Sequence, residues 1–425
     1  MLRSALPFRT SVKATGTRLL ATPTLSDGLK LLRSRDFSRL FISYLITFTG
    51  NAMAPIAIAF GVLELTGSAK DAAMVIAAPT AAQILVLLFG GVIADRTSRQ
   101  SVIVISDTVA ACSQLLIAAL LISGNATLMW LTSLMLINGI AMALHSPAVT
   151  GLITQVVDRN DLQSANALLG TARNGAMILG AALAGALVAF TSPGITIALD
   201  GMSFAASALM IASLKPAAQS RLQAASLIAD LLAGWQEFVR HRWLCAIVMQ
   251  FSLVVASVEA VFALIGPAIA RDQLGGPVAW GLITSALGIG TLAGGLASLR
   301  LQTTRPMLTA TMMVFTFVLL PLALLLSLPV PVMMAFALVQ GLGVQIFSVL
   351  WYTTLQNRVP GEMLSRVSAY DHLGSIALAP LGIIAGGYLY ETVGAEATLI
   401  TAMVIIIMPT IAVLFVPEVR NLRSA

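Results

Sequence analysis

The sequence predicts an all-α membrane protein in which twelve transmembrane helices form two pseudo-symmetric six-helix bundles. First, the 425 residues are 58% hydrophobic and only 10% charged, whereas a soluble domain carries about 25% charged residues. Second, apolar runs of about 20 residues, the length that crosses the hydrocarbon, recur along the whole chain. Third, the basic residues are concentrated in every second gap between these runs. So few charges could not cover a soluble protein, so most of the surface is expected to face lipid.

The apolar runs define the expected spans in chain order. They cover residues 38–62, 72–94, 102–122, 127–149, 165–190, 195–214, 243–268, 278–299, 307–327, 330–353, 370–390 and 397–416. A polar stretch separates the sixth run from the seventh. The expected domains are therefore an N-terminal arm (1–36), a first bundle (37–214), a linker (215–242), a second bundle (243–417) and a tail (418–425).

The distribution of Lys and Arg predicts the orientation. Of the 24 basic residues, all but Lys70, Arg173 and Arg271 fall in the arm, in alternate loops, in the linker or in the tail. Loops rich in Lys and Arg stay in the cytoplasm. We therefore expect both termini to be cytoplasmic and the span count to be even. The net charge of +6 reflects this topology and not nucleic-acid binding, because no basic residues cluster on one domain.

Two segments outside the spans have their own patterns. The first 30 residues are basic and rich in Ser and Thr, which fits either a cytoplasmic arm or an organellar targeting segment. The linker contains LIADLLAGWQEFVRH, in which Leu227, Leu231, Leu232, Trp235 and Phe238 repeat at helical spacing. This pattern predicts an amphipathic helix on the inner membrane surface, with a partner-binding helix as the alternative.

The two halves of the chain resemble each other weakly. Five residues of the first half have counterparts in the second half at a constant offset along the chain. Respectively, Gln356, Glu362, Met363, Ser365 and Gly386 correspond to Gln155, Asp161, Leu162, Ser164 and Gly185. Both sets run from the loop after the fourth span of a half into its fifth span. Parallel six-helix repeats of this kind place the substrate site between the halves, near the middle of the membrane.

The loop between the second and third spans contains the most specific motif. It reads GGVIADRTSRQ, in which Gly91, Asp95, Arg96 and Arg99 match the pattern G-x-x-x-D-R-x-x-R. This resembles the loop motif of major facilitator transporters. Glycine allows close helix approach, and an acid at a helix end can pair with a helix N-terminus or a cation across the interface. The resemblance implies a latch that holds the outward-facing state and breaks on inward opening.

Further segments resemble the superfamily branch that contains the enterobactin exporter and macrolide-efflux permeases. They are LLRSRDFSRLF, HSPAVTGLITQVV, DLQSANALLGTARN and SRVSAYDHLGSIALAPLGIIAGGYL. The resemblance implies proton-driven export of a hydrophobic or amphipathic small molecule by alternating access. Two positions depart from the family pattern: the Gly180–Gly185 stretch lacks the frequent proline, and Asn51 stands where relatives often have an acid. If that acid carries protons in the relatives, coupling must use another residue here.

Acidic residues within the spans are the candidates for proton coupling, because a charge at mid-bilayer costs about 2.5–3.5 kcal/mol on insertion scales. The candidates are Glu259, Asp200 and Asp371. Glu259 lies at the middle of the seventh span and is the preferred one. Asp200 better fits a residue near the start of its helix, and Asp371 is expected to open the eleventh span beside His372.

Other polar groups within the spans have alternative interpretations. Asp107 is expected to support the motif loop, and His145, close to Pro147, to end the fourth span. Polar and aromatic residues that could contact substrate are Asn51, Arg173, Asn174, Gln250, Phe262, Gln345 and Trp351. Such a mixture of apolar walls and a few polar groups is typical of ligand cavities, although many of these residues could equally serve helix packing.

The remaining sequence features argue against other classes of function. Cys112 and Cys245 show no spacing typical of a disulfide framework or a metal site. The chain contains no P-loop, HExxH or GxSxG motif, so neither ATP-driven pumping nor hydrolysis is indicated, and no cofactor is expected. The prediction is a monomeric transporter, not an enzyme, whose partners are a small-molecule substrate, protons and the lipid bilayer. An importer of the same fold, a membrane scaffold and a membrane-embedded enzyme remain as alternatives.

Overall fold

The structure is a computed structural model that describes residues 29–158, 161–215 and 227–423; the side chains of 87–96 and 227–231 lie outside this description. Within the described residues all regular structure is helical. The first half comprises six helices: α2 (Arg35–Thr66), α3 (Ala69–Arg96), α4 (Arg99–Ile122), α5 (Leu128–Val156), α6 (Leu162–Phe190) and α7 (Pro193–Ala212). The expected arm falls mostly outside the described part.

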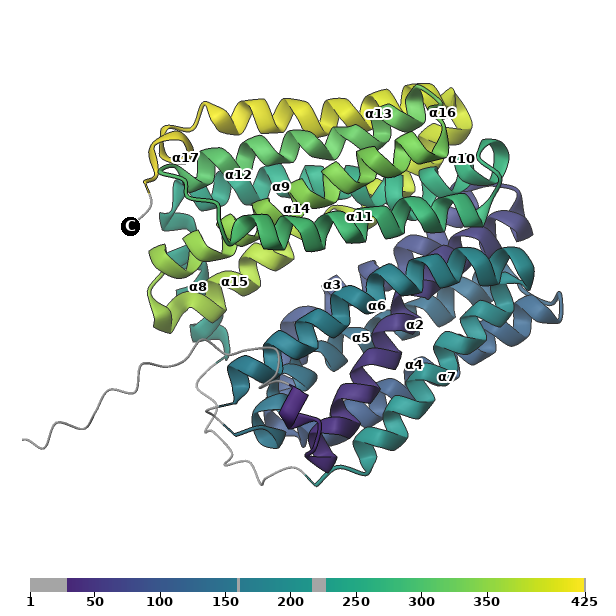
Figure 1. Cartoon of the computed structure of the whole chain (residues 1–425), viewed down its shortest axis with the longest axis horizontal. Helices are drawn as coiled ribbons and strands as arrows, with labels where there is room; N and C mark the ends of the chain where they lie inside the picture. The colour runs from purple at the N-terminus through teal and green to yellow at the C-terminus, as the bar shows by residue number, and fades with distance from the viewer. Residues whose placement is uncertain (1–28, 159–160, 216–226, 424–425) are drawn as a thin grey trace, which may run out of the picture.

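The second half follows a short linker helix, α8 (Leu227–Arg240). Its helices are α9 (Arg242–Ala260), the π-helical turn η1 (Val261–Ile265), α10 (Gly266–Gln273), α11 (Pro277–Ser298), α12 (Pro306–Val314), the 3₁₀ turn η2 (Phe315–Val318), α13 (Leu319–Leu325), α14 (Val330–Arg358), α15 (Gly361–Ile376), α16 (Ala379–Leu414) and α17 (Pro417–Asn421). Helices α2–α7 form one bundle and α9–α16 the other (Figure 1).

The described residues contain eleven helical segments that are long and apolar enough to cross a membrane. The last of them, Gly361–Leu414, has 54 residues and would extend about 80 Å as one helix, more than twice the ~30 Å of hydrocarbon. Gly394 interrupts it with φ 86° and ψ 171°, a conformation that glycine adopts without steric cost. Dividing the segment there yields twelve crossings, and the predicted fold class is confirmed.

Prolines interrupt two spans that the sequence predicts to be continuous. Proline has no backbone N–H, so Pro267 cannot donate to the carbonyl of Ala263 and Pro321 cannot donate to that of Phe317. In each case the α-helix gives way to another helical form shortly before the proline. The result is η1 in the seventh span and η2 in the ninth. At the second break, the side-chain oxygen of Gln340 accepts the Leu320 N–H at 3.3 Å, so the backbone donor is not left unpaired.

The eleventh span differs from its expected bounds of 370–390. Helix α15 begins at Gly361, nine residues earlier than expected, and the helix is interrupted after Ile376, where Pro380 cannot supply the next backbone donor. Asp371 and His372 therefore lie within α15 and do not open the span. Hydropathy missed the first turns of α15 because they are polar.

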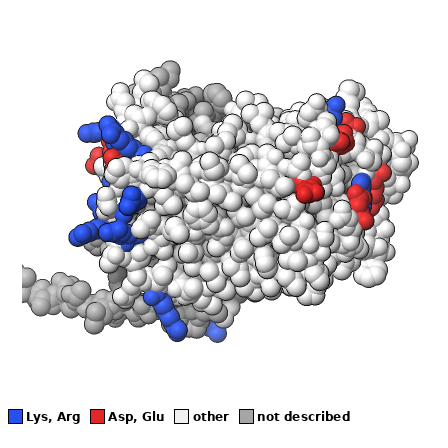
Figure 2. All heavy atoms as spheres, turned by 90° about the horizontal axis from the view of Figure 1, so that it is seen from above, with Lys and Arg blue, Asp and Glu red and all other residues white. Residues whose placement is uncertain are grey.

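The two ends of the molecule differ in charge. Arginines gather at the end that carries α8 and α17, which we call the basic end. At the opposite, distal end, acidic residues predominate over the few basic ones, and most of the face seen in Figure 2 between the two ends is uncharged. Large apolar side chains are exposed on this belt, for example Leu85 at 73%, Leu209 at 74% and Met249 at 73%. Such exposure is unfavourable in water and favourable in lipid.

The apolar core shows how the halves meet. At the distal end one continuous cluster of buried residues includes members of both bundles, such as Ile58 and Ala73 from the first half and Ile265 and Ile283 from the second. Toward the basic end the core divides into a separate cluster in each half. The halves converge at the distal end and diverge at the basic end (Figure 1).

Helix α8 is found where the linker pattern predicts a helix. It packs on α15 and α9 of the second half. The buried ring of Phe238 stacks on Trp235 at 5.8 Å between centroids, and both rings contact Tyr370. Leu232 and Trp235 remain about half exposed, so α8 has one face on the bundle and part of its apolar surface free to meet lipid headgroups. Leu227 and Leu231 belong to the side chains outside the description.

Candidate substrate cavity

A cavity of about 430 Å³ lies between the two halves. Helices α2 and α6 supply its wall in the first half, and α9, η1, α11 and α14 supply the wall in the second. It includes four residues that the sequence analysis names as candidates: Asn51, Asn174, Glu259 and Phe262. The rest of the lining is mostly apolar, with a few hydroxyl and amide groups. A drug-sized molecule fits a cavity of this volume.

In the first half, two amides face the cavity from neighbouring helices. Asn51 and Pro55 line it from α2, and Asn174 and Met177 line it from α6. Arg173, next to Asn174, does not line this cavity. Its guanidinium lies 5.3 Å from the centre of the Phe48 ring, a distance at which a cation is attracted to the aromatic face. Arg173 is exposed at the protein surface, and the Phe48 ring is its cation–π partner among the described residues.

Glu259 is the acidic residue of the central cavity. It occupies the penultimate position of α9, directly before the π-helical turn, and its side chain is accessible from the cavity although it lies deep between the bundles. Within the described part of the chain, no Lys, Arg or His lies within ion-pair distance of its carboxylate. An unpaired charge between two apolar bundles is costly. This position therefore favours either a proton or a cationic ligand.

The π-helical turn places aromatic groups beside Glu259. It brings Phe262 and Ala263 to the cavity wall, and π-turns of this kind often occur at functional sites. The Phe262 ring lies 5.9 Å from that of Trp280 on α11. Trp280 in turn packs directly over Gly266, where a Cβ atom would collide with the indole. Glycine at 266 thus allows the indole to reach the cavity.

Several cavity residues were not among the sequence candidates. They are Trp280, Thr284 and Thr291 on α11 and Gln340 on α14. The signal was present on α11, because Trp280, Thr284, Gly288 and Thr291 follow each other at helical spacing and so share one face. Small and hydroxyl residues on one face of an apolar helix are also typical of helix packing, and for that reason the pattern alone was not decisive.

The cavity is closed toward the distal end by two close helix crossings. At the first, Gly185 of α6 meets Gly281 and Pro277 of α11, with no room for a side chain, and Ser285 donates to the Ile178 carbonyl at 2.9 Å. At the second, Gly387 of α16 lies against Ala69 and Ala73 of α3. The residue that the internal repeat aligns with Gly185 is Gly386, which packs against Ala260 and Ile265 within the second half; the neighbouring Gly387 makes the crossing.

Polar contacts reinforce this closure. The carboxylate of Glu391 accepts hydrogen bonds from the Ser68 hydroxyl and, at 3.0 Å, from the Lys70 backbone N–H. Arg271 donates to the Leu63 carbonyl at 2.8 Å, near the C-terminus of α2, where a cation is favourable. Each contact joins the two halves.

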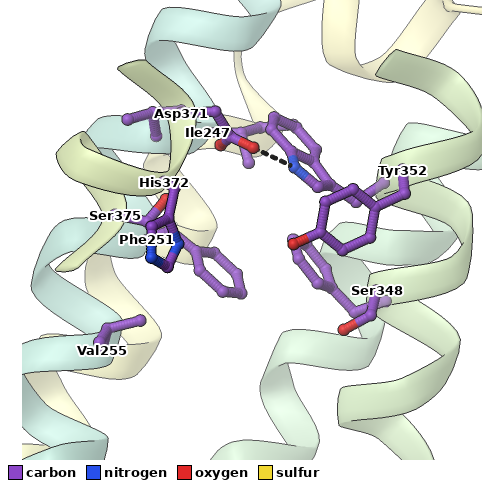
Figure 3. A pocket seen from close by; sticks show the side chains of 11 residues that line it. Ile247, Phe251, Val255, Ser348, Tyr352, Asp371, His372 and Ser375 are labelled. Atoms are coloured by element: carbon purple, nitrogen blue, oxygen red, sulfur yellow. Dashed lines mark hydrogen bonds between the residues drawn. The ribbon is translucent and has the colours of Figure 1, made fainter. Parts of the chain in front are cut away.

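A second, smaller pocket of about 150 Å³ lies toward the basic end and is formed by α9, α14 and α15 (Figure 3). Asp371 contributes its carboxylate, which accepts a hydrogen bond from the Trp351 indole at 2.9 Å. Tyr352, His372 and Ser348 also line this pocket. The structure therefore separates Asp371 and Trp351 from the cavity of Glu259.

Three further candidates lie inside the bundles. Asp200 is fully buried and accepts from Gln114 at 2.7 Å, beside the backbone of Gly50. Gln250 is buried and donates to the Thr410 hydroxyl at 2.8 Å. Gln345 packs against Gly294 of α11. None of the three lines the central cavity. In each case the amide or acid faces a neighbouring helix, which sequence alone could not show.

Asp107 and His145 have roles that differ from those expected. Asp107 is fully buried, and its two oxygens lie 2.8 Å from Nδ1 of His145 and 2.5 Å from the Ser207 hydroxyl. Ser43 continues the chain, with 2.7 Å between the two serine hydroxyls. Asp107 thus pairs within the first bundle and does not support the motif loop, while α5 continues past His145 to Val156.

The motif loop is only partly described. The side chains of Gly91, Asp95 and Arg96 lie outside the description. Arg99, at the start of α4, donates to the Gly151 carbonyl of α5 at 2.9 Å, and the guanidinium fills the space where a side chain at 151 would be. In this conformation Arg99 therefore joins two helices of one half.

Comparisons with known proteins agree with this architecture. The multidrug efflux pump Tap of Mycolicibacterium fortuitum is 24% identical over 391 residues, which cover 88% of this chain and 94% of Tap. An uncharacterised major facilitator-type transporter of Bacillus subtilis, YvqJ, is 23% identical over 389 residues, covering 89% and 92% of the two chains.

Solved structures share the fold at low sequence identity. A mutant of the nucleoside transporter NupG matches with a TM-score of 0.77 at 14% identity, covering 89% of this chain and 99% of that one. A bacterial homologue of the lysosomal transporter Spinster, in an inward-facing and unoccupied conformation, matches with a TM-score of 0.71 at 11% identity, covering 91% and 98%. The family model described as transmembrane secretion effector matches residues 26–424. The chain therefore belongs to the transmembrane secretion effector family of major facilitator transporters, and it is a multi-pass membrane transporter and not an enzyme.

Proposed function

We propose that this protein is a proton-coupled exporter of hydrophobic or amphipathic small molecules across the bacterial inner membrane. The observation that carries the proposal is the position of Glu259, an acid without an ion-pair partner among the described residues, in a largely apolar cavity between two halves whose apolar cores merge at the distal end. The similarity to Tap, a multidrug efflux pump, supports export over import.

The proposed topology places the basic end in the cytoplasm, in accord with the positive-inside rule. Both described chain ends and the linker helix lie at that end (Figure 1). The cavity then opens toward the cytoplasm in this conformation, and the Glu391 and Arg271 contacts form a closed periplasmic gate. Substrate would enter from the cytoplasm or the inner leaflet, as an exporter requires.

Coupling follows from the cost of an unpaired carboxylate. Glu259 can be neutralised by a proton or by a cationic group, but one carboxylate does not hold both at full strength. Substrate binding from the cytoplasm releases the proton, the halves rock to open the periplasmic side, and a new proton there displaces the substrate. A neutral amphiphile would be exchanged in the same way if its polar groups compete for the Glu259 carboxylate.

The cavity lining supports broad and not narrow recognition. Its polar groups are amides and hydroxyls (Asn51, Asn174, Thr284 and Gln340), which accept or donate hydrogen bonds without demanding one charge. Phe262, Trp280 and Met177 supply polarisable apolar surface. We propose that the transporter acts as a monomer, since each half already packs against the other around a complete cavity.

Everted membrane vesicles that contain the protein test this proposal. After energisation, a panel of macrolides, siderophores and lipophilic cations is added while a dye reports the pH gradient. A substrate-dependent collapse of the gradient, absent from vesicles without the protein, is expected. Exit of substrate from loaded vesicles together with protons would instead identify an importer, and substrate movement that does not depend on the gradient would reject proton coupling.

A further inference from the structure

The small pocket near the basic end lies on the same path as the central cavity. On α9, Phe251 and Val255 line the small pocket, and Glu259, one helical turn further on, lines the central cavity. On α14, Ser348 and Val344 are related in the same way. One continuous face of each helix therefore lines both spaces, and a molecule from the basic end passes the small pocket first.

Aromatic rings form one side of this pocket. Phe347 is stacked between Phe251, at 4.3 Å and 13°, and Trp351, at 6.1 Å and 12°. Figure 3 shows Tyr352 opposite Phe251, with its hydroxyl directed into the pocket. The stack holds the rings in fixed orientations and leaves them little freedom to lose when a ligand binds. Aromatic faces attract organic cations within about 6 Å of the ring centre.

A buried acid completes the pocket. Asp371 is 6% exposed, and the Trp351 indole donates to one of its oxygens. In the described part of the chain, no Lys, Arg or His comes within ion-pair distance of this carboxylate, and the neighbouring His372 points into the pocket without contacting it (Figure 3). The acid is thus held by a neutral donor beside aromatic faces and has no ion-pair partner among the described residues, although Arg173 of the other half is near enough to interact electrostatically with Tyr352.

We propose that this pocket is a capture site for the ammonium group of amphipathic organic cations, with Asp371 as the counter-ion and Tyr352 and the aromatic stack as the walls. The volume of about 150 Å³ admits one benzene-sized group, so the pocket takes the charged end of a larger molecule. The remainder would extend along α9 and α14 toward the central cavity. As a step in export the site rests on the proposed function, but binding itself does not.

Equilibrium binding of radiolabelled phenyltrimethylammonium to the purified full-length protein in nanodiscs tests the site, with no ion gradient present. The Asp371→Asn variant is expected to bind at least tenfold more weakly. Glu362→Gln removes a charge from an exposed position of the same helix, outside the pocket, and is expected to bind within twofold of the unaltered protein. Neutral N,N-dimethylbenzamide, of similar size, is expected to compete poorly.

Each outcome decides the proposal. No binding to the unaltered protein at millimolar probe, or equal binding by Asp371→Asn and Glu362→Gln, overturns it. Should Asp371→Asn not yield folded protein, Tyr352→Leu replaces it: Tyr352 is 54% exposed, so folding is expected to be retained, while cation affinity falls severalfold. Unchanged affinity there overturns the proposal as well. Cation binding without gradient-driven transport in vesicles would keep the capture site and reject the proposed export function.

Discussion

The Glu391 carboxylate accepts the backbone N–H of Lys70 at 3.0 Å, and so an acid of the second half caps the first turn of α3 in the first half. Ser68 donates to the same carboxylate. An anion strengthens the contact, because hydrogen bonds to a charged acceptor are stronger and because the helix N-terminus carries partial positive charge. It stabilises the conformation in which the distal end is closed.

The Glu391→Gln substitution is expected to favour opening of the distal end. Because Glu391 is exposed, its contribution is about 0.5–1 kcal/mol, and the population of the open state should rise about two- to fivefold. The measurement is the rate at which a membrane-impermeant maleimide, added outside intact cells, labels a cysteine placed at Ala263, with Cys112 and Cys245 replaced. Glu396→Gln, at the same end and without a hydrogen bond in the structure, serves as the control. Equal labelling rates in the two variants would contradict the gate.

The Glu259→Gln substitution is expected to abolish uphill transport while preserving exchange. Glutamine keeps the size and polarity of the side chain but cannot carry a proton, so gradient-driven efflux should fall at least tenfold. Exchange of labelled for unlabelled substrate across the membrane, which needs no net proton movement, should continue. Full proton-coupled efflux in this variant would show that another group carries the proton.

The His145→Ala substitution is expected to destabilise the first bundle. It leaves Asp107, which is fully buried, without its 2.8 Å partner, and removal of one member of a buried pair costs about 3–5 kcal/mol. The melting temperature in detergent should fall by several degrees. Combining His145→Ala with Asp107→Ser removes the buried acid as well and should recover part of the loss. A double variant less stable than the single one would show that Asp107 is not the source of the cost.

The Gly266→Ala substitution is expected to disturb the cavity wall. The added methyl group meets the indole of Trp280, which is 1% exposed, and overpacking of this kind costs about 1–3 kcal/mol. We expect a lower melting temperature and a changed apparent affinity for substrate. Gly170→Ala, at a helical position with open space around it, is the matched control and should be neutral or slightly stabilising. Identical substrate affinity in the two variants would place Trp280 outside the binding surface.

Hydropathy predicted the helices well, because it follows from the cost of polar groups in lipid. Most spans agree with their expected bounds within a few residues. The failures are local: η1, η2 and the early start of α15 depend on single prolines and on polar first turns, which a hydropathy average does not register.

The candidate site could be predicted only in part, and the reason differs from that for the helices. Asn51, Asn174, Glu259 and Phe262 share one cavity, while Gln250 and Asp200, of equal polarity, bind neighbouring helices within a bundle. A polar residue in an apolar span indicates that a hydrogen-bonding partner is needed, but the sequence does not identify that partner. Likewise, the pairing of Asp107 with His145 joins helices α4 and α5, and no spacing along the chain indicates it.

The crossings of Gly185 with Gly281 and of Gly387 with Ala73 bear on how such a transporter could change its cargo. Both depend on backbone proximity, and the side chains that line the cavity come from other positions on α2, α6, α9, α11 and α14. Substitutions at those positions can alter volume and polarity without moving the surfaces on which the halves turn. New substrate preferences could thus arise by point mutation, while the helix crossings on which the halves move stay unchanged.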